Sequence, residues 1–260
     1  MKILFTADIS GRVGRRMAAE GLFDYKSRTD ITVAIANAEN AAGGLGITRE
    51  IYEELSRAGY MLFTMGNHTF DKKEVESLMR ENENIIRPAN YPEGTPGKGM
   101  EILTAPGGEK IAVINLMGQA FLDKNLSSPF LKADELVEAA RKITPIIFVD
   151  FHAEATAEKV ALGRYLDGRV TAVIGTHTHI QTADERILPG GCAYLTDAGM
   201  TGPADSCLGM KVDVAINRFL DREPKRFEIA KGKGQWNGVV IEADPETGKA
   251  ISIERIQESE

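Results

Sequence analysis

Residues 2–40 read KILFTADISGRVGRRMAAEGLFDYKSRTDITVAIANAEN and contain one complete βαβ unit. Residues 2–7 and 31–36 are apolar runs of strand length, and the stretch 12–20 between them is amphipathic, which is typical of a helix. Strands that alternate with helices predict a parallel sheet. Polar side chains follow both strands: Asp8 comes after the first, and Glu39 and Asn40 come after the second.

The same alternation continues along most of the chain. Further strands are predicted at 61–65, 110–116, 146–151 and 170–174, and helices at 48–58, 72–80, 132–143 and 155–165. The segment 87–97 is rich in Pro and Gly and predicts a surface loop. Shorter runs at 193–196, 226–230, 239–242 and 250–255 indicate antiparallel edges or a second sheet, with a turn at 244–248. No polar linker divides them, so we expect a single α/β domain over residues 1–260.

Composition excludes several classes of protein. A formal net charge of -7 argues against a stable nucleic-acid complex or attachment to an anionic membrane, because both require a basic surface. The apolar runs are far shorter than the roughly 20 residues that span a bilayer, and the first is too short for a signal-peptide core. Cys192 and Cys207 are the only cysteines, which is weak support for a disulfide scaffold. We therefore expect a cytoplasmic protein.

The residue types that bind metals lie at the ends of the predicted strands. The chain has only four histidines, and His68, His152, His177 and His179 all lie at or just beyond a strand. Because the carboxyl ends of parallel strands meet at one edge of a sheet, we expect them to converge with the acidic and amide groups after the first two strands. Imidazole, carboxylate and amide ligands suit Mn, Fe or Zn.

Two short motifs shape this expectation. In the run 175–179, GTHTH, two histidines stand two residues apart, and Gly175 is expected to provide the turn that brings their rings together. The run 66–68, GNH, places Asn67 and His68 directly after a strand. Each feature has an ordinary interpretation as a turn, a helix cap or a surface histidine. A non-functional explanation would require all these ordinary interpretations to hold at once, so the combination favours a functional site.

The motifs resemble the calcineurin-like metallophosphoesterases, and more closely their bacterial YmdB-like branch. The resemblance spans essentially the whole chain and rests on these runs: ENAAG at 39–43, MGNHTFDKKE at 65–74, RPAN at 87–90, DFHAEAT at 150–156, GTHTH at 175–179 and TDAGMTGP at 196–203. The wider superfamily usually begins with Asp-x-His, whereas this chain has Ser10 two residues after Asp8. In the YmdB-like branch the missing ligand is replaced by the Asn after the bridging acid, which is Asn40 here.

The resemblance implies a fold, an activity and a set of ligands. The fold is a sandwich of two mixed sheets flanked by helices. The activity is phosphodiester hydrolysis, with 2',3'-cyclic nucleotides among the substrates, and the metals are two ions of iron or manganese, with zinc also compatible. The first ion would be bound by Asp8, Glu39, Asn40 and His179, and the second by Glu39, Asn67, His152 and His177, with Glu39 bridging.

Such a centre would activate a shared water or hydroxide, and His68 is the candidate general acid because it follows a ligand without being needed as one. Asp150 and Glu154 flank His152 and are candidates to orient imidazoles, although solvated charge is an equally open interpretation. A phosphomonoesterase of a small metabolite and a regulatory nucleotide-binding protein with low turnover remain alternatives. Substrate-binding residues are unknown at this point, and a homo-oligomer is expected only from its general frequency.

Overall fold

The βαβ unit predicted from residues 2–40 begins the first of two mixed sheets. The computed structural model describes residues 1–260 except 83, 123–124 and 221–227. Four parallel strands follow one another in this sheet, and antiparallel strands from the C-terminal part of the chain extend it beyond β1. Its strands are β1 (Lys2–Thr6), β2 (Val33–Asn37), β3 (Leu62–Thr64), β4 (Ile85–Ile86), β11 (Gly202–Pro203), β12 (Gly234–Ala243) and β13 (Ala250–Ser259).

The second sheet has the order β5-β6-β7-β8-β10-β9. Its central strands β6, β7, β8 and β10 are parallel, and β5 and β9 close its two edges in antiparallel orientation. The strands are β5 (Met100–Thr104), β6 (Lys110–Met117), β7 (Ile147–His152), β8 (Ala172–Thr176), β9 (Arg186–Ile187) and β10 (Ala193–Leu195).

Alternation along the strands explains how the sheets pack. Ile3 and Phe5 of β1 face the core between the two sheets, whereas Leu4 faces the helices. On the second sheet Phe148 of β7 points to the same core, and its ring lies 5.1 Å from that of Phe5. Because successive side chains of a strand point to opposite faces, a strand covered on both faces is apolar throughout.

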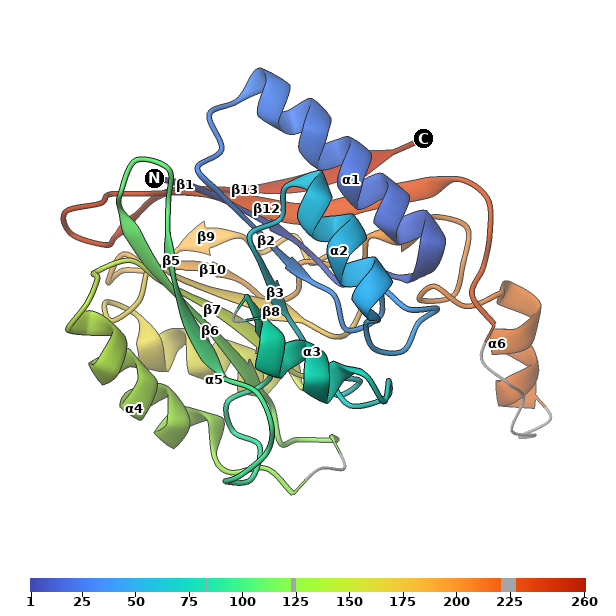
Figure 1. Ribbon diagram of the computed structural model, residues 1–260, viewed down its shortest axis with the longest axis horizontal. Coiled ribbons are helices and arrows are strands. Elements are labelled where there is room, and N and C mark those ends of the chain that lie inside the picture. The colour runs from blue at the N-terminus through green and yellow to red at the C-terminus, as the bar shows by residue number, and fades with distance from the viewer. Residues whose placement is uncertain (83, 123–124, 221–227) are drawn as a thin grey trace.

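Helices cover the outer faces, as Figure 1 shows: α1 and α2 lie on the first sheet, and α4 and α5 on the second. The short helix α6 stands apart at the edge of the molecule. None of the helices in the described ranges is long and apolar enough to cross a membrane. The helices are α1 (Gly11–Arg28), α2 (Arg49–Ala58), α3 (Val75–Glu81), α4 (Pro129–Arg141), α5 (Thr156–Leu166) and α6 (Val212–Leu220).

The two-sheet α/β fold is confirmed, and most predicted elements are present within a few residues. α1 is longer than expected, because Gly21 and Leu22 continue its buried face. The loop at 87–97 and the turn at 244–248 are also found. Sequence patterns missed α6 and the strands β4, β5, β9 and β11. Of the run predicted at 226–230, residues 226–227 lie outside the described residues, and Ile229 forms only an isolated bridge.

The carboxyl ends of the two sheets meet at one edge. Asn37, the last residue of β2, donates a hydrogen bond of 3.0 Å from Nδ2 to Asp150 Oδ2 on β7. The backbone N–H of Met65, just after β3, donates to Asn115 Oδ1 on β6 over 3.1 Å. The ends of β2 and β3 in the first sheet therefore adjoin the ends of β6 and β7 in the second.

Candidate metal centre

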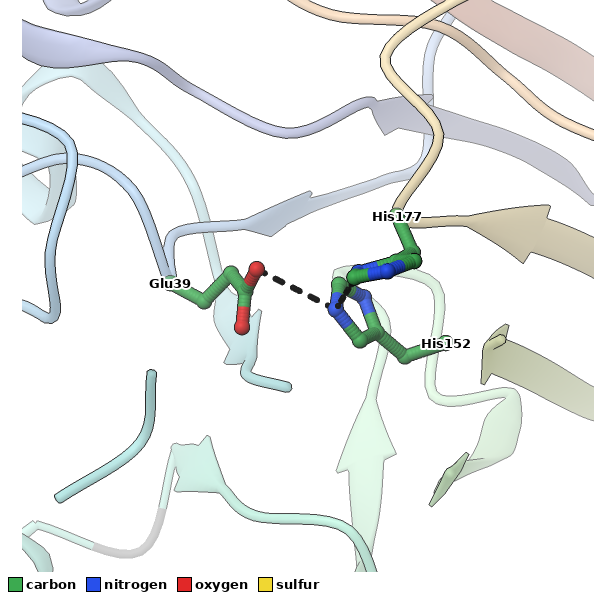
Figure 2. A group of neighbouring side chains, drawn as sticks. All are labelled: Glu39, His152 and His177. Atoms are coloured by element: carbon green, nitrogen blue, oxygen red, sulfur yellow. Dashed lines mark hydrogen bonds and ion pairs between the residues drawn. The ribbon is translucent and has the colours of Figure 1, made fainter. Parts of the chain in front are cut away.

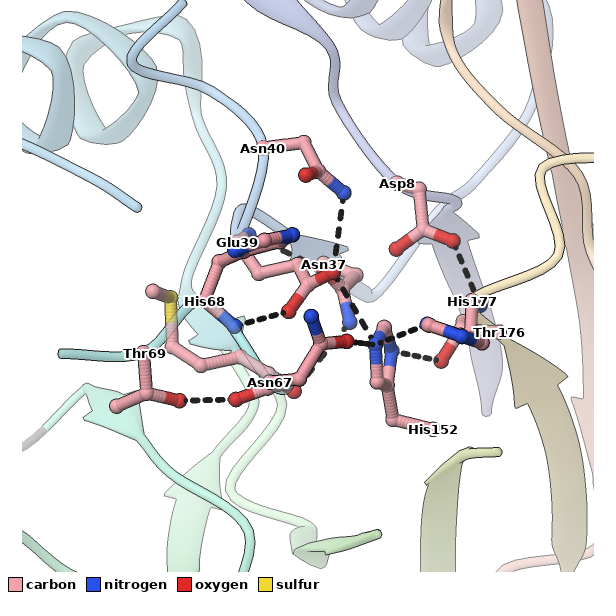
Figure 3. A network of polar contacts seen from close by, with 12 residues as sticks. Asp8, Asn37, Glu39, Asn40, Asn67, His68, Thr69, His152, Thr176 and His177 are labelled. Atoms are coloured by element: carbon pink, nitrogen blue, oxygen red, sulfur yellow. Dashed lines mark hydrogen bonds and ion pairs between the residues drawn. The ribbon is translucent and has the colours of Figure 1, made fainter. Parts of the chain in front are cut away.

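Every predicted ligand lies at this shared edge. Asp8 follows β1, the pair Glu39 and Asn40 follows β2, and Asn67 follows β3. From the second sheet, His152 is the last residue of β7, and His177 and His179 follow β8. Sequence reasoning thus identified a set of residues that the fold brings together, and Figure 3 labels all of them except His179.

A compact trio forms the middle of the site. One ligand atom each of Glu39, His152 and His177 lies within 4.8 Å of the other two, so the group could bind a metal ion. His152 Nε2 lies 3.1 Å from Glu39 Oε1 and 3.1 Å from His177 Nδ1. Figure 2 shows the carboxylate and the two rings turned toward one another. Glu39 and His152 are almost completely buried.

The loop after β3 closes this trio from the other side. Asn67 Oδ1 lies 2.9 Å from His152 Nε2, and the backbone N–H of His68 donates to Glu39 Oε2 over 3.0 Å. A Cβ at Gly66 would lie 2.3 Å from Glu39 Oε2 and 2.4 Å from His152 Nε2. Glycine is therefore required here for close approach and not for an unusual backbone angle.

A second group of polar atoms adjoins the first. Asn40 Nδ2 lies 3.1 Å from Glu39 Oε1 and 3.2 Å from His179 Nε2. Asp8 Oδ2 accepts the backbone N–H of His177 at 2.8 Å and lies 4.0 Å from His179 Nε2. Asp8 Oδ1 is buried and has no hydrogen-bond partner among the described residues. A buried carboxylate oxygen without a donor is unfavourable unless a cation binds it, so this group fits a metal ion.

Polar partners outside the trio set the orientation of the imidazoles. His152 Nδ1 lies 3.0 Å from Thr176 Oγ1, which donates to Asp150 Oδ1 over 2.7 Å. His177 Nε2 lies 3.0 Å from Glu154 Oε2. Asp150 thus acts on His152 only through Thr176, and Glu154 contacts His177 and not His152. Such outer contacts decide which ring nitrogen faces a bound metal.

The third histidine depends on a contact that sequence reasoning missed. His179 Nδ1 lies 3.1 Å from the backbone carbonyl of Leu208. A backbone carbonyl carries no sequence signal, so only the folded chain identifies Leu208.

The turn at GTHTH differs from the prediction. Gly175 lies within β8 and does not have a positive φ, so it does not provide the turn. His177 and His179 themselves adopt the left-handed region, with φ of 100° and 65°. Gly175 is needed instead for space, because a Cβ there would lie 1.8 Å from the carbonyl oxygen of Thr196. Two strained residues at one site are typical of functional geometry.

Charge is concentrated inside the site. Burial raises the pKa of Asp8 well above its ordinary value. Burial would also lower the pKa of His152, but the adjacent Glu39 carboxylate outweighs it and raises that pKa to about 9. For Glu39, the charge of His152 outweighs burial and holds the pKa well below its usual range. Burial and the neighbouring His152 lower the pKa of His177 to about 3. Two buried carboxylates, Asp8 and Glu39, adjoin these imidazoles, and such a concentration of carboxylate oxygens favours a cation.

A cavity of about 340 Å³ opens onto these groups. Its polar side is formed by Glu39, His68 and five further polar residues, namely Asn40, Glu154, His177, Thr178 and His179. Leu45, Leu208 and Met210 form an apolar wall, of which Leu208 is 48% exposed. The cavity can therefore hold a ligand that has both an anionic and an apolar part.

His68 lines this cavity, and the Nδ1 atom of its ring has an acidic partner. Its Nδ1 lies 2.6 Å from Asp71 Oδ2. No protein partner of Nε2 is found within the described ranges. Asp71 lies three residues after His68, and this spacing was the available signal for the contact. Sequence reasoning did not single out Asp71.

Comparison with known proteins agrees with the residue pattern. The family model described as "YmdB-like protein" matches residues 4–256. A Bacillus subtilis (strain 168) protein named 2',3'-cyclic-nucleotide 2'-phosphodiesterase is 54% identical over 256 residues, which is 98% of this chain and 96% of that protein.

Two solved structures share the fold over the whole chain. A crystal structure described as a novel phosphatase from Mycoplasma pneumoniae is 36% identical, with a TM-score of 0.93, and covers 100% of this chain and 93% of that one. A hypothetical protein from Thermus thermophilus is 42% identical, also with a TM-score of 0.93, and covers 100% of both chains. On the family match, on these identities and on the strand-end residues that carry the motifs, the chain belongs to the YmdB-like family.

Proposed function

We propose that the chain is a phosphodiesterase with two metal ions that hydrolyses 2',3'-cyclic nucleotides. The coarser assignment, a phosphoric ester hydrolase, follows from the family and from the named relatives. The finer assignment is supported by the Bacillus subtilis relative and by the geometry of the site.

The observation that carries the proposal is the position of Glu39 between two groups of ligand atoms. Its Oε1 lies 3.1 Å from His152 Nε2 and 3.1 Å from Asn40 Nδ2. We assign Glu39 as the bridging ligand. The first ion would be bound by Asp8, Glu39, Asn40 and His179, and the second by Glu39, Asn67, His152 and His177.

These residues fit such ions. Asp8 supplies an unpartnered oxygen, and rotation of the Asn40 amide would present its oxygen in place of Nδ2. Mixed oxygen and nitrogen ligands support iron or manganese, and zinc is also compatible. When bound, two such ions supply a water of lowered pKa and neutralise charge on the phosphate oxygens.

His68 is the proposed general acid. Asp71 holds Nδ1 at 2.6 Å, so Nε2 can carry a proton toward the cavity. That proton would be given to the leaving alkoxide as the phosphorus–oxygen bond breaks. The apolar wall of Leu45, Leu208 and Met210 offers a surface for a nucleobase.

The test compares natural and activated esters. Metal is removed from the protein and replaced with manganese or iron, and hydrolysis of 2',3'-cyclic AMP, bis(p-nitrophenyl) phosphate and p-nitrophenyl phosphate is measured. We expect diester cleavage that depends on metal. His68→Ala should retain its metal and lose on the order of a hundredfold in turnover of 2',3'-cyclic AMP. It should lose less on the nitrophenyl diester, whose leaving group needs no proton.

Other results would redirect the assignment. Cleavage of the monoester alone would indicate a phosphomonoesterase. Two bound metals without any turnover would indicate a regulatory nucleotide-binding protein. Loss of metal in His68→Ala equal to its loss of activity would contradict the general-acid role.

We also propose that residues 1–260 act as one domain, since a single core cluster contains residues of both sheets. A cytoplasmic location is supported by two free cysteines, Cys192 and Cys207. A homo-oligomer stays a prediction, to be tested by analytical ultracentrifugation.

A further inference from the structure

A buried ion pair lies behind the candidate metal centre. Lys159 Nζ on α5 lies 2.6 Å from Asp197 Oδ2, which is on the loop after β10, and each side chain is only 1% exposed. Removing two charges from water is unfavourable, and apolar residues of similar volume are often at least as stable. A buried ion pair is therefore weak evidence that its residues serve only to stabilise the fold. The contacts of this pair point to another role.

Asp197 holds the loop that carries two of the proposed ligands. Its Oδ2 also accepts the backbone N–H of Thr178 at 3.1 Å, and its Oδ1 accepts that of Gly199 at 2.9 Å. The backbone carbonyl of Asp197 also accepts a hydrogen bond of 3.0 Å from the N–H of Thr182, which lies further along the loop after β8. One carboxylate thus connects the loop after β8 to the loop after β10.

Thr178 is the residue between His177 and His179. Both histidines have positive φ, which costs free energy for residues other than glycine and persists only when surrounding contacts enforce it. The N–H of Thr178 is fixed by Asp197, and the N–H of His177 is fixed by Asp8 at 2.8 Å. These bonds hold the two peptide units on either side of His177, and the second of them leads into Thr178, the residue before His179.

Lys159 reaches Asp197 beside Gly175. A Cβ at Gly175 would lie 3.1 Å from Lys159 Cδ, so the missing side chain leaves room for the lysine stem. In its ion pair Lys159 fixes the same carboxylate oxygen that accepts from Thr178. The position of that oxygen is therefore set from the side of the sheet that faces α5.

We propose that Lys159 and Asp197 are positioning residues that hold the strained His177–Thr178–His179 backbone in the geometry that presents both imidazoles to the metal centre. The inference rests on the proposed function in that it takes both histidines as metal ligands. The inference goes beyond the proposed function because it assigns the geometry of His177 and His179 to a charge pair that contacts neither histidine directly.

The test uses a double variant, Lys159→Met with Asp197→Asn, which removes both charges and leaves neither one buried alone. Asp167→Asn is the matched control, because Asp167 also accepts two backbone N–H groups, from Gly190 and Cys192, away from the site. Circular dichroism and thermal unfolding establish that each variant is folded. If the double variant does not fold, the nearly isosteric Asp197→Asn alone is measured.

Two readouts separate positioning from general stability. Hydrogen exchange of the peptide containing Thr178, measured on metal-free protein, should become faster in the double variant and stay unchanged in the control. Manganese affinity should fall about 10- to 100-fold, as found for outer-shell partners of metal ligands, with an altered manganese EPR spectrum. Unchanged exchange and unchanged affinity in a folded double variant would overturn the inference.

Failure of the proposed function gives a different result. If the unsubstituted chain bound manganese but cleaved no diester, the proposed activity would be wrong, while the exchange and affinity comparisons would still support or overturn the role of Lys159 and Asp197.

Discussion

Gly66→Ala adds a single methyl group at the most crowded point of the metal centre. The new Cβ would lie 2.3 Å from Glu39 Oε2 and 2.4 Å from both Nε2 and Cδ2 of His152. Gly66 does not have a positive φ, so alanine is compatible with its backbone. The substitution therefore tests space at the ligands and not backbone strain.

The size of the effect follows from these distances. Ordinary contacts begin at 3.4 Å, so relieving the contacts requires relative movements of about 1 Å at Glu39 and His152. Both side chains are buried and cannot move into solvent. Because a displacement of about 1 Å at a catalytic centre can cost on the order of a hundredfold in rate, we expect a loss of that size.

The assay measures bound manganese per chain and the turnover of bis(p-nitrophenyl) phosphate. Gly107→Ala is the matched control, because its Cβ would also lie 2.3 Å from a carboxylate oxygen, that of Glu109. Glu109 is exposed and can rotate away, so this variant should retain full metal content and activity. Wild-type metal content and turnover in Gly66→Ala would refute the close packing described for this site.

Three further predictions concern individual side chains. Asp8→Asn should reduce bound metal from two ions to one per chain by mass spectrometry, because Asp8 Oδ1 is an unpartnered oxygen among the ligands proposed for the first ion; retention of both ions would contradict this assignment. Asp71→Asn should lower turnover of 2',3'-cyclic AMP about tenfold and affect the nitrophenyl diester less, because it loosens His68; equal loss on both would argue against the proton-transfer role. Burial raises the pKa of the Cys192 thiol, so Ellman's reagent should label only Cys207 in the folded protein and both thiols in urea; rapid labelling of two thiols without urea would be inconsistent with the buried position.

Much of the site was accessible from the sequence because its signal is local. Each ligand type lies at the end of an apolar run, and strand periodicity alone places Asp8, Glu39 and His152 at the edge where parallel strands end. The choice between ordinary turns and a functional site depended on the coincidence of these features along the chain. The division of the strands into two sheets came from family resemblance, since periodicity does not specify which strands pair.

Only the tertiary structure decided how the ligands are held. Asp71 supports His68, Glu154 contacts His177, and the carbonyl of Leu208 faces His179. The turn expected at Gly175 is made by the histidines themselves.

The physical reason is the range of the interactions. Apolar periodicity reflects which face of an element is buried, so the sequence by itself determined most of the elements, the strand ends that carry the site and the candidate ligands. Strain at His177 and the ion pair of Lys159 with Asp197 depend on contacts between distant segments. Such contacts leave no periodic trace in the sequence, and only packing of the two sheets and α5 around one loop brings these groups together.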